Sequence, residues 1–479
     1  MSLQSKIGVG IAVVLFFTYA FFPQDFRNDN VVSRMALTLS ILEDGTLKIN
    51  KFQGLTEDIA FYHGGYYSDK APGMAFSALP SAAIIRATRM SGGGEGATLR
   101  SGRLTRNFQI IVYWSTLFTS GLMTAIAALA LYFLALRIGA SIAGAIFATL
   151  SFGLATPAWG WSSAFFGHAV AGASLFLGFA AVFYLLQGSL EERREILTAM
   201  LAGALLMWGV VVEFTTLPAA GITVLYGIIT ARHWKRSKAL RVILSAGIAA
   251  ILFAVPLFVY NTLAFGSPLR VGYASVPGFE GLREGFFGLA YPQGDVLYRL
   301  IFPQHRGILW YAPILVSTPF AFYFLWRQAK LRGLALVVGL VALYYLLMNA
   351  SYFYWEGGDS TGPRHLTPSL AFLCLPLAIL WSRAQRIFKP VLFALFVLSF
   401  QVALVCAAVD MFSPAGFREP LFDYLIPAFL NGDILRPPFI RGLNGHMILF
   451  PLLLVWASGY LYVCRMLMKR EETTQPQVG

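Results

Sequence analysis

The chain has 479 residues, of which 57% are hydrophobic, 15% aromatic and only 12% charged. Soluble domains carry roughly 25% charged residues, and a mean hydropathy of +0.66 indicates that lipid replaces water over much of the surface. The net charge of +13 is not gathered into one basic domain, so it indicates charges flanking membrane helices and excludes a nucleic-acid partner.

Apolar runs that can cross a bilayer recur along the chain. A helical span needs about 20 residues, and about twelve such runs occur. They lie near residues 7–22, 108–136, 139–157, 164–187, 196–213, 215–231, 242–262, 307–326, 334–350, 366–382, 390–409 and 444–463. The first resembles a signal peptide, but no small-residue cleavage site follows it, so we interpret it as an uncleaved helix. The sequence predicts an all-α polytopic membrane protein.

Charges in the short loops predict the orientation of these helices. With a cytoplasmic N-terminus, every short charged loop on that side is basic, as is the start of the C-terminal tail. The residues are Arg137, Arg193, Arg194, Arg232, Lys235, Arg236, Lys238, Arg327, Lys330, Arg332, Arg383, Arg386, Lys389, Arg465, Lys469 and Arg470. We therefore predict one transmembrane domain over residues 1–470, with both termini cytoplasmic, and a disordered tail over 471–479.

The longer connections then face the outer side of the membrane. They are residues 23–107, 263–305, 351–365 and 410–443. Within the first, 31–43 has apolar residues at helical spacing, and 72–90 is apolar but contains Pro80, Arg86 and Arg89. Counting 72–90 as a span would place the basic loops outside. We therefore predict that both segments are helices on the outer membrane surface.

The first outer segment begins Arg27-Asn28-Asp29-Asn30, directly after the first predicted span. A carboxylate at the membrane face can take the proton of a hydroxyl that arrives from water. Alternatively, Asp29 or Asn30 caps the helix that starts near Val31, and spacing alone favours the cap.

A lysine precedes the second surface helix, in the run Tyr66-Tyr67-Ser68-Asp69-Lys70-Ala71-Pro72-Gly73. Lys70 at this boundary can bind a lipid phosphate. From this position alone, the better interpretation is that the apolar stem of Lys70 lies along the membrane interface and its ammonium reaches water.

The order of these elements resembles the first outer loop of the GT-C glycosyltransferases, in the bacterial branch similar to protein O-mannosyltransferases and lipid A aminoarabinose transferases. There the loop reads Asp-Glu before a helix and then Tyr-x-x-Lys-Pro-Pro; here Asn30 and Ala71 depart from it. The resemblance runs from about residue 7 to 382. It continues in order through Trp161–Ala169, Tyr260–Tyr273, Gly288–Pro313 and Trp355–Arg364.

The resemblance implies transfer of a sugar from a polyprenyl-phosphate donor to an acceptor on the outer face of a bacterial inner membrane, with inversion. Asp29 would match the catalytic base and Lys70 the lysine that holds the donor phosphate. The acceptor remains open between a glycan, a lipid and a protein. Because only one loop acid matches, we expect a reaction without metal or other cofactor.

Further site candidates follow from the chemistry that the resemblance implies. Negative charge builds on the phosphate as its bond to the sugar breaks, so positioned cations are expected around it. Arg306 and Arg364 are candidates beside Lys70, and for each an interfacial cation is an equal alternative. Tyr67, Asp69, His168, Trp355 and Glu356 are candidate substrate-binding residues. A structural histidine and an interfacial aromatic belt are the favoured alternatives for His168 and the aromatic residues.

Other functions leave different patterns. The three cysteines lie in or at the end of apolar runs and the six histidines form no metal-binding spacing, so no metal site is predicted. A transporter or lipid flippase is the main alternative, and it would place charges or broken helices at mid-membrane in two related halves. Here the charges cluster in outer loops and no such halves are evident. A structural membrane protein is a third interpretation.

Overall fold

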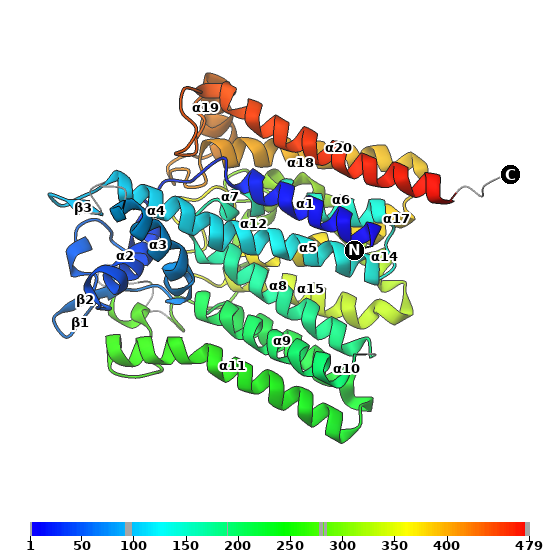
Figure 1. Cartoon of the computed structure of the whole chain (residues 1–479), viewed down its shortest axis with the longest axis horizontal. Coiled ribbons are helices and arrows are strands. Elements are labelled where there is room, and N and C mark those ends of the chain that lie inside the picture. Colours follow the sequence, from blue (N-terminus) through cyan, green and yellow to red (C-terminus); the bar gives the residue numbers. More distant parts are fainter. Residues whose placement is uncertain (1, 92–97, 189, 277–280, 282–284, 475–479) are drawn as a thin grey trace.

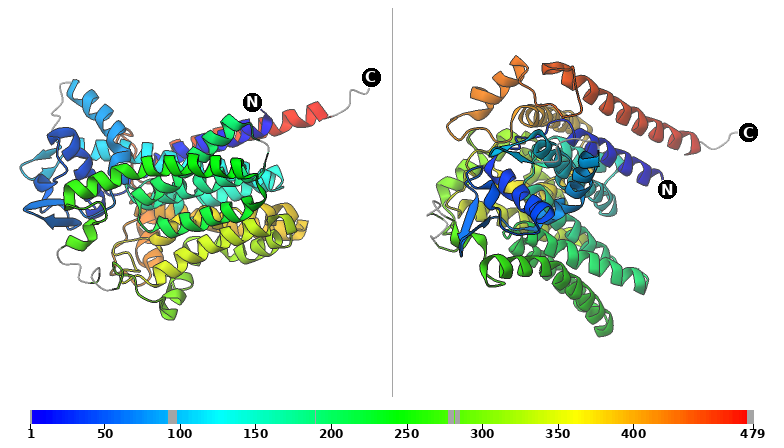
Figure 2. Two further views of the ribbon diagram at one scale, coloured as in Figure 1. Left: turned by 90° about the horizontal axis from the view of Figure 1, so that it is seen from below. Right: turned by 60° about the vertical axis from the view of Figure 1, so that its left-hand side comes forward.

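The computed structural model describes residues 2–91, 98–188, 190–276, 281 and 285–474. Long helices lie side by side in a bundle, and both chain termini lie at its right-hand end in Figure 1. At the left-hand end, α2, α3 and two short hairpins form an outer layer. Figure 2 shows from another side that this layer extends beyond the bundle.

The bundle is built from the predicted apolar runs, each of which contains a helix. Its main helices are α1 (Leu3–Tyr19), α4 (Arg106–Thr116), α5 (Leu122–Arg137), α6 (Ile142–Leu154), α8 (Gly167–Leu186), α9 (Glu192–Val212), α10 (Thr216–Thr230), α11 (Arg236–Phe265), α14 (Thr318–Trp326), α15 (Arg332–Ala350), α17 (Leu377–Arg383), α18 (Lys389–Val409) and α20 (Leu449–Thr474). Shorter helices are α7 (Ala158–Ser162), α12 (Gly294–Ile301), α13 (Ile308–Tyr311), α16 (Leu370–Cys374) and α19 (Ile426–Asn431).

Eight helical stretches of the described residues are long and apolar enough to cross a membrane. Shorter apolar helices, including α1 and α6, lie among them. The predicted all-α polytopic fold is thus confirmed, while the number of about twelve spans stays a prediction. A π-helical turn at Leu117–Gly121 joins α4 to α5, so one continuous stretch leads from the outer layer into the bundle.

Burial differs sharply between helices of similar composition. α8 packs against α5, α9 and α10 and is buried along almost its whole length, as expected of a helix that is apolar all round. α11 and α20 lie at opposite edges of Figure 1 and expose large apolar side chains, such as Ile251 (68%) and Leu263 (67%). Lipid must cover such surfaces, because water would make their exposure costly.

The predicted surface helices are α2 (Asp29–Asp44) and α3 (Gly73–Ser91). α2 begins after Asn28, whose side chain accepts from the Asn30 amide, and ends at Gly45 in the left-handed conformation. The helix cap is therefore Asn28 and not Asp29 or Asn30. α2 is buried from Asn30 to Ser40 because α3 and the neighbouring hairpin pack on it, so protein covers most of a helix that was expected at the membrane surface.

A tight hairpin lies between α2 and α3. Its strands β1 (Ile59–Tyr62) and β2 (Gly65–Ser68) pair antiparallel, with Ile59 opposite Ser68. His63 and Gly64 form the turn at φ values of 46° and 73°, the left-handed pair of a type I′ turn. This register brings residues 58 and 69 together. The second hairpin pairs β3 (Leu99–Arg100) with β4 (Arg103–Leu104).

The last helix extends into the predicted tail, whose disorder stays a prediction. α20 continues to Thr474, although disorder was predicted from residue 471. No glycine or proline interrupts the chain between Gly459 and Pro476, so nothing local ends the helix earlier. Residues 475–479 of the predicted tail lie outside the described residues.

Candidate active site

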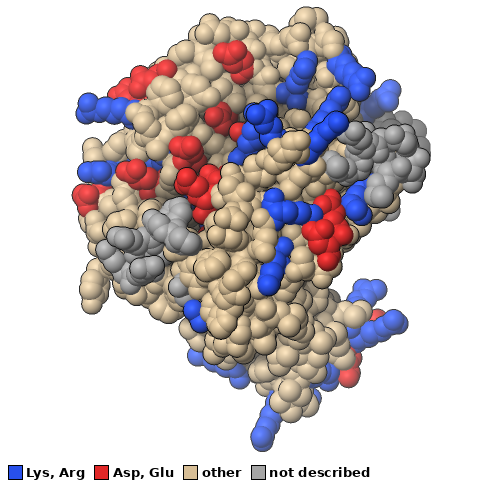
Figure 3. Space-filling view, turned by 90° about the vertical axis from the view of Figure 1, so that its left-hand side faces the viewer, with Lys and Arg blue, Asp and Glu red and all other residues tan. Residues whose placement is uncertain are grey.

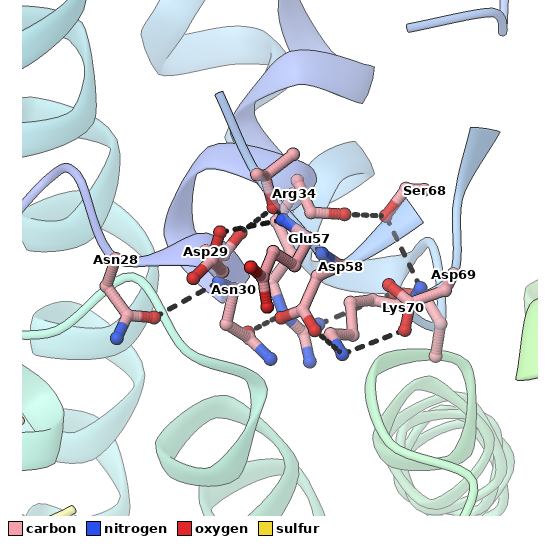
Figure 4. A network of polar contacts seen from close by, with 12 residues as sticks. Asn28, Asp29, Asn30, Arg34, Glu57, Asp58, Ser68, Asp69 and Lys70 are labelled. Atoms are coloured by element: carbon pink, nitrogen blue, oxygen red, sulfur yellow. Dashed lines mark hydrogen bonds and ion pairs between the residues drawn. The ribbon is translucent and has the colours of Figure 1, made fainter. Parts of the chain in front are cut away.

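Lys70 lies at the centre of a polar cluster in the outer layer (Figure 4). Its Nζ is 2.9 Å from Asp58 Oδ1 and 2.9 Å from Asp69 Oδ2, and its side chain is 12% exposed. Burial alone would lower the pKa of Lys70, but the two carboxylates outweigh that effect and raise it. The ammonium therefore stays charged, and among the described residues its contacts with the two carboxylates leave one of its three hydrogens without a partner.

The two carboxylates that contact Lys70 differ in their surroundings. Asp69 is 2% exposed, and its Oδ1 has no hydrogen-bond partner among the described residues. Burial raises the pKa of the Asp69 carboxyl to about 6, although the Lys70 ammonium opposes the shift. Asp58 is 14% exposed and follows the exposed Glu57. Asp69 thus contacts Lys70 from the buried side of the ammonium, and Asp58 contacts it from the side that is more exposed.

Asp29 is the first residue of α2 and is exposed. Its Oδ1 accepts from the Glu57 amide at 2.7 Å, and its carbonyl accepts from Thr56 Oγ1 at 2.8 Å. Asp29 therefore binds the backbone that carries Asp58, and Figure 4 shows the two acids on adjacent parts of one network. The role of Asp29 as base stays a prediction.

An ion pair joins the outer layer to the bundle. Arg34 of α2 donates to Glu213 Oε1 at 2.8 Å and to Asn30 Oδ1 at 2.7 Å. The side chains of Arg34 and Glu213 are only 3% and 10% exposed. Glu213 ends α9, and its Oε1 is also 3.8 Å from Nδ1 of His168. His168 is therefore linked to the Lys70 region through Glu213.

Arg364 is a cation without an ion-pair partner among the described residues. It begins a 3₁₀ turn (Arg364–Ser369), its guanidinium lies 5.4 Å from the ring centre of Phe166, and its Nε is buried without a hydrogen bond. Arg364 thus adds positive charge next to Phe166, which lies two residues before His168 in the chain.

The segment that carries Lys70 is fixed against the bundle by backbone contact. Gly73 begins α3, three residues after Lys70, and a Cβ there would lie 2.6 Å from backbone atoms of Val211 and Val212 in α9. No side chain fits at that distance. The absence of a side chain therefore lets α3 start directly on the end of α9.

Arg306 lies elsewhere in the hydrogen-bond network. It is fully buried and donates to the carbonyl oxygens of Glu356 (2.8 Å), Gly358 (2.8 Å) and His305 (3.0 Å). In the structure it therefore holds the turn before Arg364, and binding of donor phosphate by Arg306 stays a prediction.

The remaining predicted residues are dispersed. Tyr67 is buried and packs on Phe265, with ring centres 5.6 Å apart. Trp355 is half-buried, with the Arg299 guanidinium 5.8 Å from its ring centre. Glu356 contributes its carbonyl to Arg306. Of the predicted residues, Asp69 contacts the Lys70 ammonium directly. His168 contacts Glu213.

Sequence reasoning missed Asp58 and Arg34. A signal for Asp58 existed: the strand-like runs Ile59–Tyr62 and Gly65–Ser68 flank His63-Gly64, which is typical of a two-residue hairpin. That hairpin places Asp58 opposite Asp69. Arg34 had no comparable local signal, because its partner Glu213 lies 179 residues away.

The described residues contain no group of three or more His, Cys, Asp or Glu side chains that could hold a metal ion. Figure 3 shows the outer end of the molecule, where acidic and basic side chains are interspersed over the surface. Mixed charge of this kind is typical of a protein surface that faces water.

No family model matches the sequence, and no curated protein matches it. The structure is similar to that of ArnT from Cupriavidus metallidurans bound to undecaprenyl phosphate, with a TM-score of 0.53 and 14% identity over 96% of this chain and 69% of that one. For ArnT in the apo state, the TM-score is 0.52 and the identity 14%, over 96% and 73% of the two chains. The predicted likeness is confirmed for the fold: this chain has the GT-C fold of the membrane glycosyltransferases.

Proposed function

We propose that this chain is a glycosyltransferase that moves a sugar from a polyprenyl-phosphate donor to an acceptor hydroxyl. The observation that carries the proposal is Lys70, a charged and largely buried ammonium with one hydrogen left for an anion. It lies in a chain with the fold of ArnT, one of whose structures contains undecaprenyl phosphate.

The cluster suits a phosphate leaving group. As the bond between sugar and phosphate breaks, negative charge grows on the phosphate, and a preorganised cation stabilises that charge most where water is scarce. Lys70 is 12% exposed, and Arg364 has no carboxylate within ion-pair distance among the described residues. Both cations are thus available to the phosphate.

Asp29 is the proposed general base. Its carboxylate is exposed at the start of α2, where an acceptor can arrive from water, and it lies in the network that reaches Lys70 (Figure 4). It would take the acceptor's proton while the hydroxyl attacks the anomeric carbon opposite the leaving phosphate. That geometry inverts the configuration.

The proposed location is the outer face of a bacterial inner membrane. The outer layer lies at the end of the bundle opposite both termini (Figure 1). The basic short loops predict that the termini are cytoplasmic, so the cluster would face the periplasm, where the acceptor is a glycan, a lipid or a protein.

The test is transfer from a panel of polyprenyl-phosphate sugars by the purified protein in liposomes. We expect Asp29→Asn to lower kcat by about 10²–10⁴ with little change in donor KM, and Lys70→Met to raise donor KM and lower kcat together. Asp44→Asn, at the other end of α2, and Lys48→Met, an exposed residue of the same outer segment, are the matched controls.

Two results would contradict the proposal. Equal turnover by wild type and Asp29→Asn would remove Asp29 from the mechanism. Movement of intact donor across the membrane without release of polyprenyl phosphate, for every sugar tested, would favour a flippase.

A further inference from the structure

We propose that Asp58 is a displaceable counter-ion of Lys70 that leaves when a donor phosphate binds the ammonium. We further propose that the 56–58 segment couples donor binding to release of the Asp29 carboxylate. This inference rests on the proposed function and adds a step that precedes the transfer.

The first argument is the balance of charge around Lys70. Among the described residues, two cations pair with three carboxylates: Lys70 with Asp58 and Asp69, and Arg34 with Glu213. A polyprenyl-phosphate sugar is a phosphodiester and brings one more negative charge into a region of low exposure. An uncompensated charge there is costly, so a carboxylate must leave when the phosphate binds.

The second argument identifies which carboxylate leaves. Asp69 is 2% exposed and lies behind Lys70. Glu213 is 2.8 Å from the buried Arg34 and cannot leave without breaking that pair. Asp58 is the most exposed of the three, at 14%, and its neighbour Glu57 is exposed to solvent. Asp58 is therefore the carboxylate of the three that is most accessible to water.

The third argument links this movement to Asp29. The Glu57 amide donates to Asp29 Oδ1, and Glu57 is bonded directly to Asp58. The Asp58 amide donates to Thr56 Oγ1, so a backbone shift of residues 56–58 that carries Asp58 away from Lys70 also moves the Thr56–Glu57 peptide. That peptide carries the Glu57 N–H, and its hydrogen bond to Asp29 breaks. A carboxylate that loses an N–H donor becomes more basic. Asp29 would thus be released as a base when a donor occupies Lys70.

The test is binding of undecaprenyl phosphate to the full-length protein in lipid nanodiscs. We expect Asp58→Asn to bind the probe about tenfold more tightly than wild type, because one competing charge is removed from Lys70. Asp58→Glu keeps the charge and should bind like wild type. Glu57→Gln removes the adjacent carboxylate but leaves the Glu57 amide and Asp58 in place, so it is the matched control.

A second variant tests the link to Asp29. Thr56→Val removes the hydroxyl that donates to the Asp29 carbonyl and accepts from the Asp58 amide, and so loosens the 56–58 segment without changing charge. We expect it to tighten probe binding, by less than Asp58→Asn does. Unchanged binding would overturn the coupling between the segment and Asp29.

The outcomes separate this inference from the proposed function. If wild type binds the probe and Asp58→Asn binds it equally or more weakly, Asp58 is not a competitor and the inference is wrong while the donor site stands. If neither wild type nor Asp58→Asn binds the probe, both the inference and the proposed donor are wrong.

Discussion

The Arg34–Glu213 ion pair connects the outer layer with the bundle, and its removal should have a large effect. Arg34 is 3% and Glu213 10% exposed, with N and O 2.8 Å apart. Breaking a buried pair by removing one partner costs about 3–5 kcal/mol, because the other charge stays buried and unpaired. We therefore expect Arg34→Met to lower the free energy of unfolding by about that amount.

A double-mutant cycle isolates the pair. Glu213→Gln keeps an acceptor for Arg34 but removes the charge, and Arg34→Met/Glu213→Gln leaves no unpaired charge. The double variant should therefore be more stable than Arg34→Met alone, with a coupling energy of roughly 1–3 kcal/mol. The measurement is reversible unfolding in mixed micelles, together with the rate of trypsin cleavage in the outer layer.

An exposed pair supplies the control for this cycle. Arg299 and Asp295 are 54% and 62% exposed and 3.7 Å apart, so Arg299→Met should change stability by under about 1 kcal/mol. Additive losses at Arg34 and Glu213, or equal losses at Arg34 and Arg299, would refute the reasoning that burial makes the pair strong.

Two further predictions concern Asp69 and Arg306. The folded-state pKa of Asp69 is raised to about 6, so its contribution to stability is fully present below the ordinary pKa near 4 and is lost as pH rises through about 6. Asp69→Asn mimics the protonated acid, so its stability relative to wild type should rise by on the order of 1–3 kcal/mol between pH 4 and pH 7; a pH-independent difference in thermal unfolding would contradict this. Arg306→Lys should destabilise the chain by about 2–4 kcal/mol, because a single ammonium cannot reach the carbonyls of residues 305, 356 and 358 that the planar guanidinium holds. Wild-type thermal stability of Arg306→Lys would contradict the structural role.

The sequence was most informative where periodicity and lipid exposure decide the structure. The apolar runs are helical because a membrane requires every backbone polar group to be bonded within its own segment. Lys70 was found because it stands in a recognisable order of elements, directly beside Asp69. These features depend on short stretches of chain.

The rest of the site depends on contacts between distant segments. Asp58 meets Lys70 only through the register of the β1–β2 hairpin, and Arg34 meets Glu213 across 179 residues. Burial of α2 likewise depends on what packs on it and not on its own composition. Residue type alone also could not separate Arg306, bound to three carbonyls, from Arg364, whose Nε has no partner among the described residues.

Gly73 fixes where the segment that carries Lys70 meets the bundle. Because α3 begins on the backbone of α9, the position of Lys70 relative to the bundle is set by main-chain contact and not by an adjustable side chain. A methyl group at position 73 would have to lift that part of the chain by something on the order of 1 Å, and misplacement on that scale can cost about 10²-fold in rate. In the proposed reaction, the place where the donor phosphate meets Lys70 would then depend on one missing side chain, remote from any reacting atom.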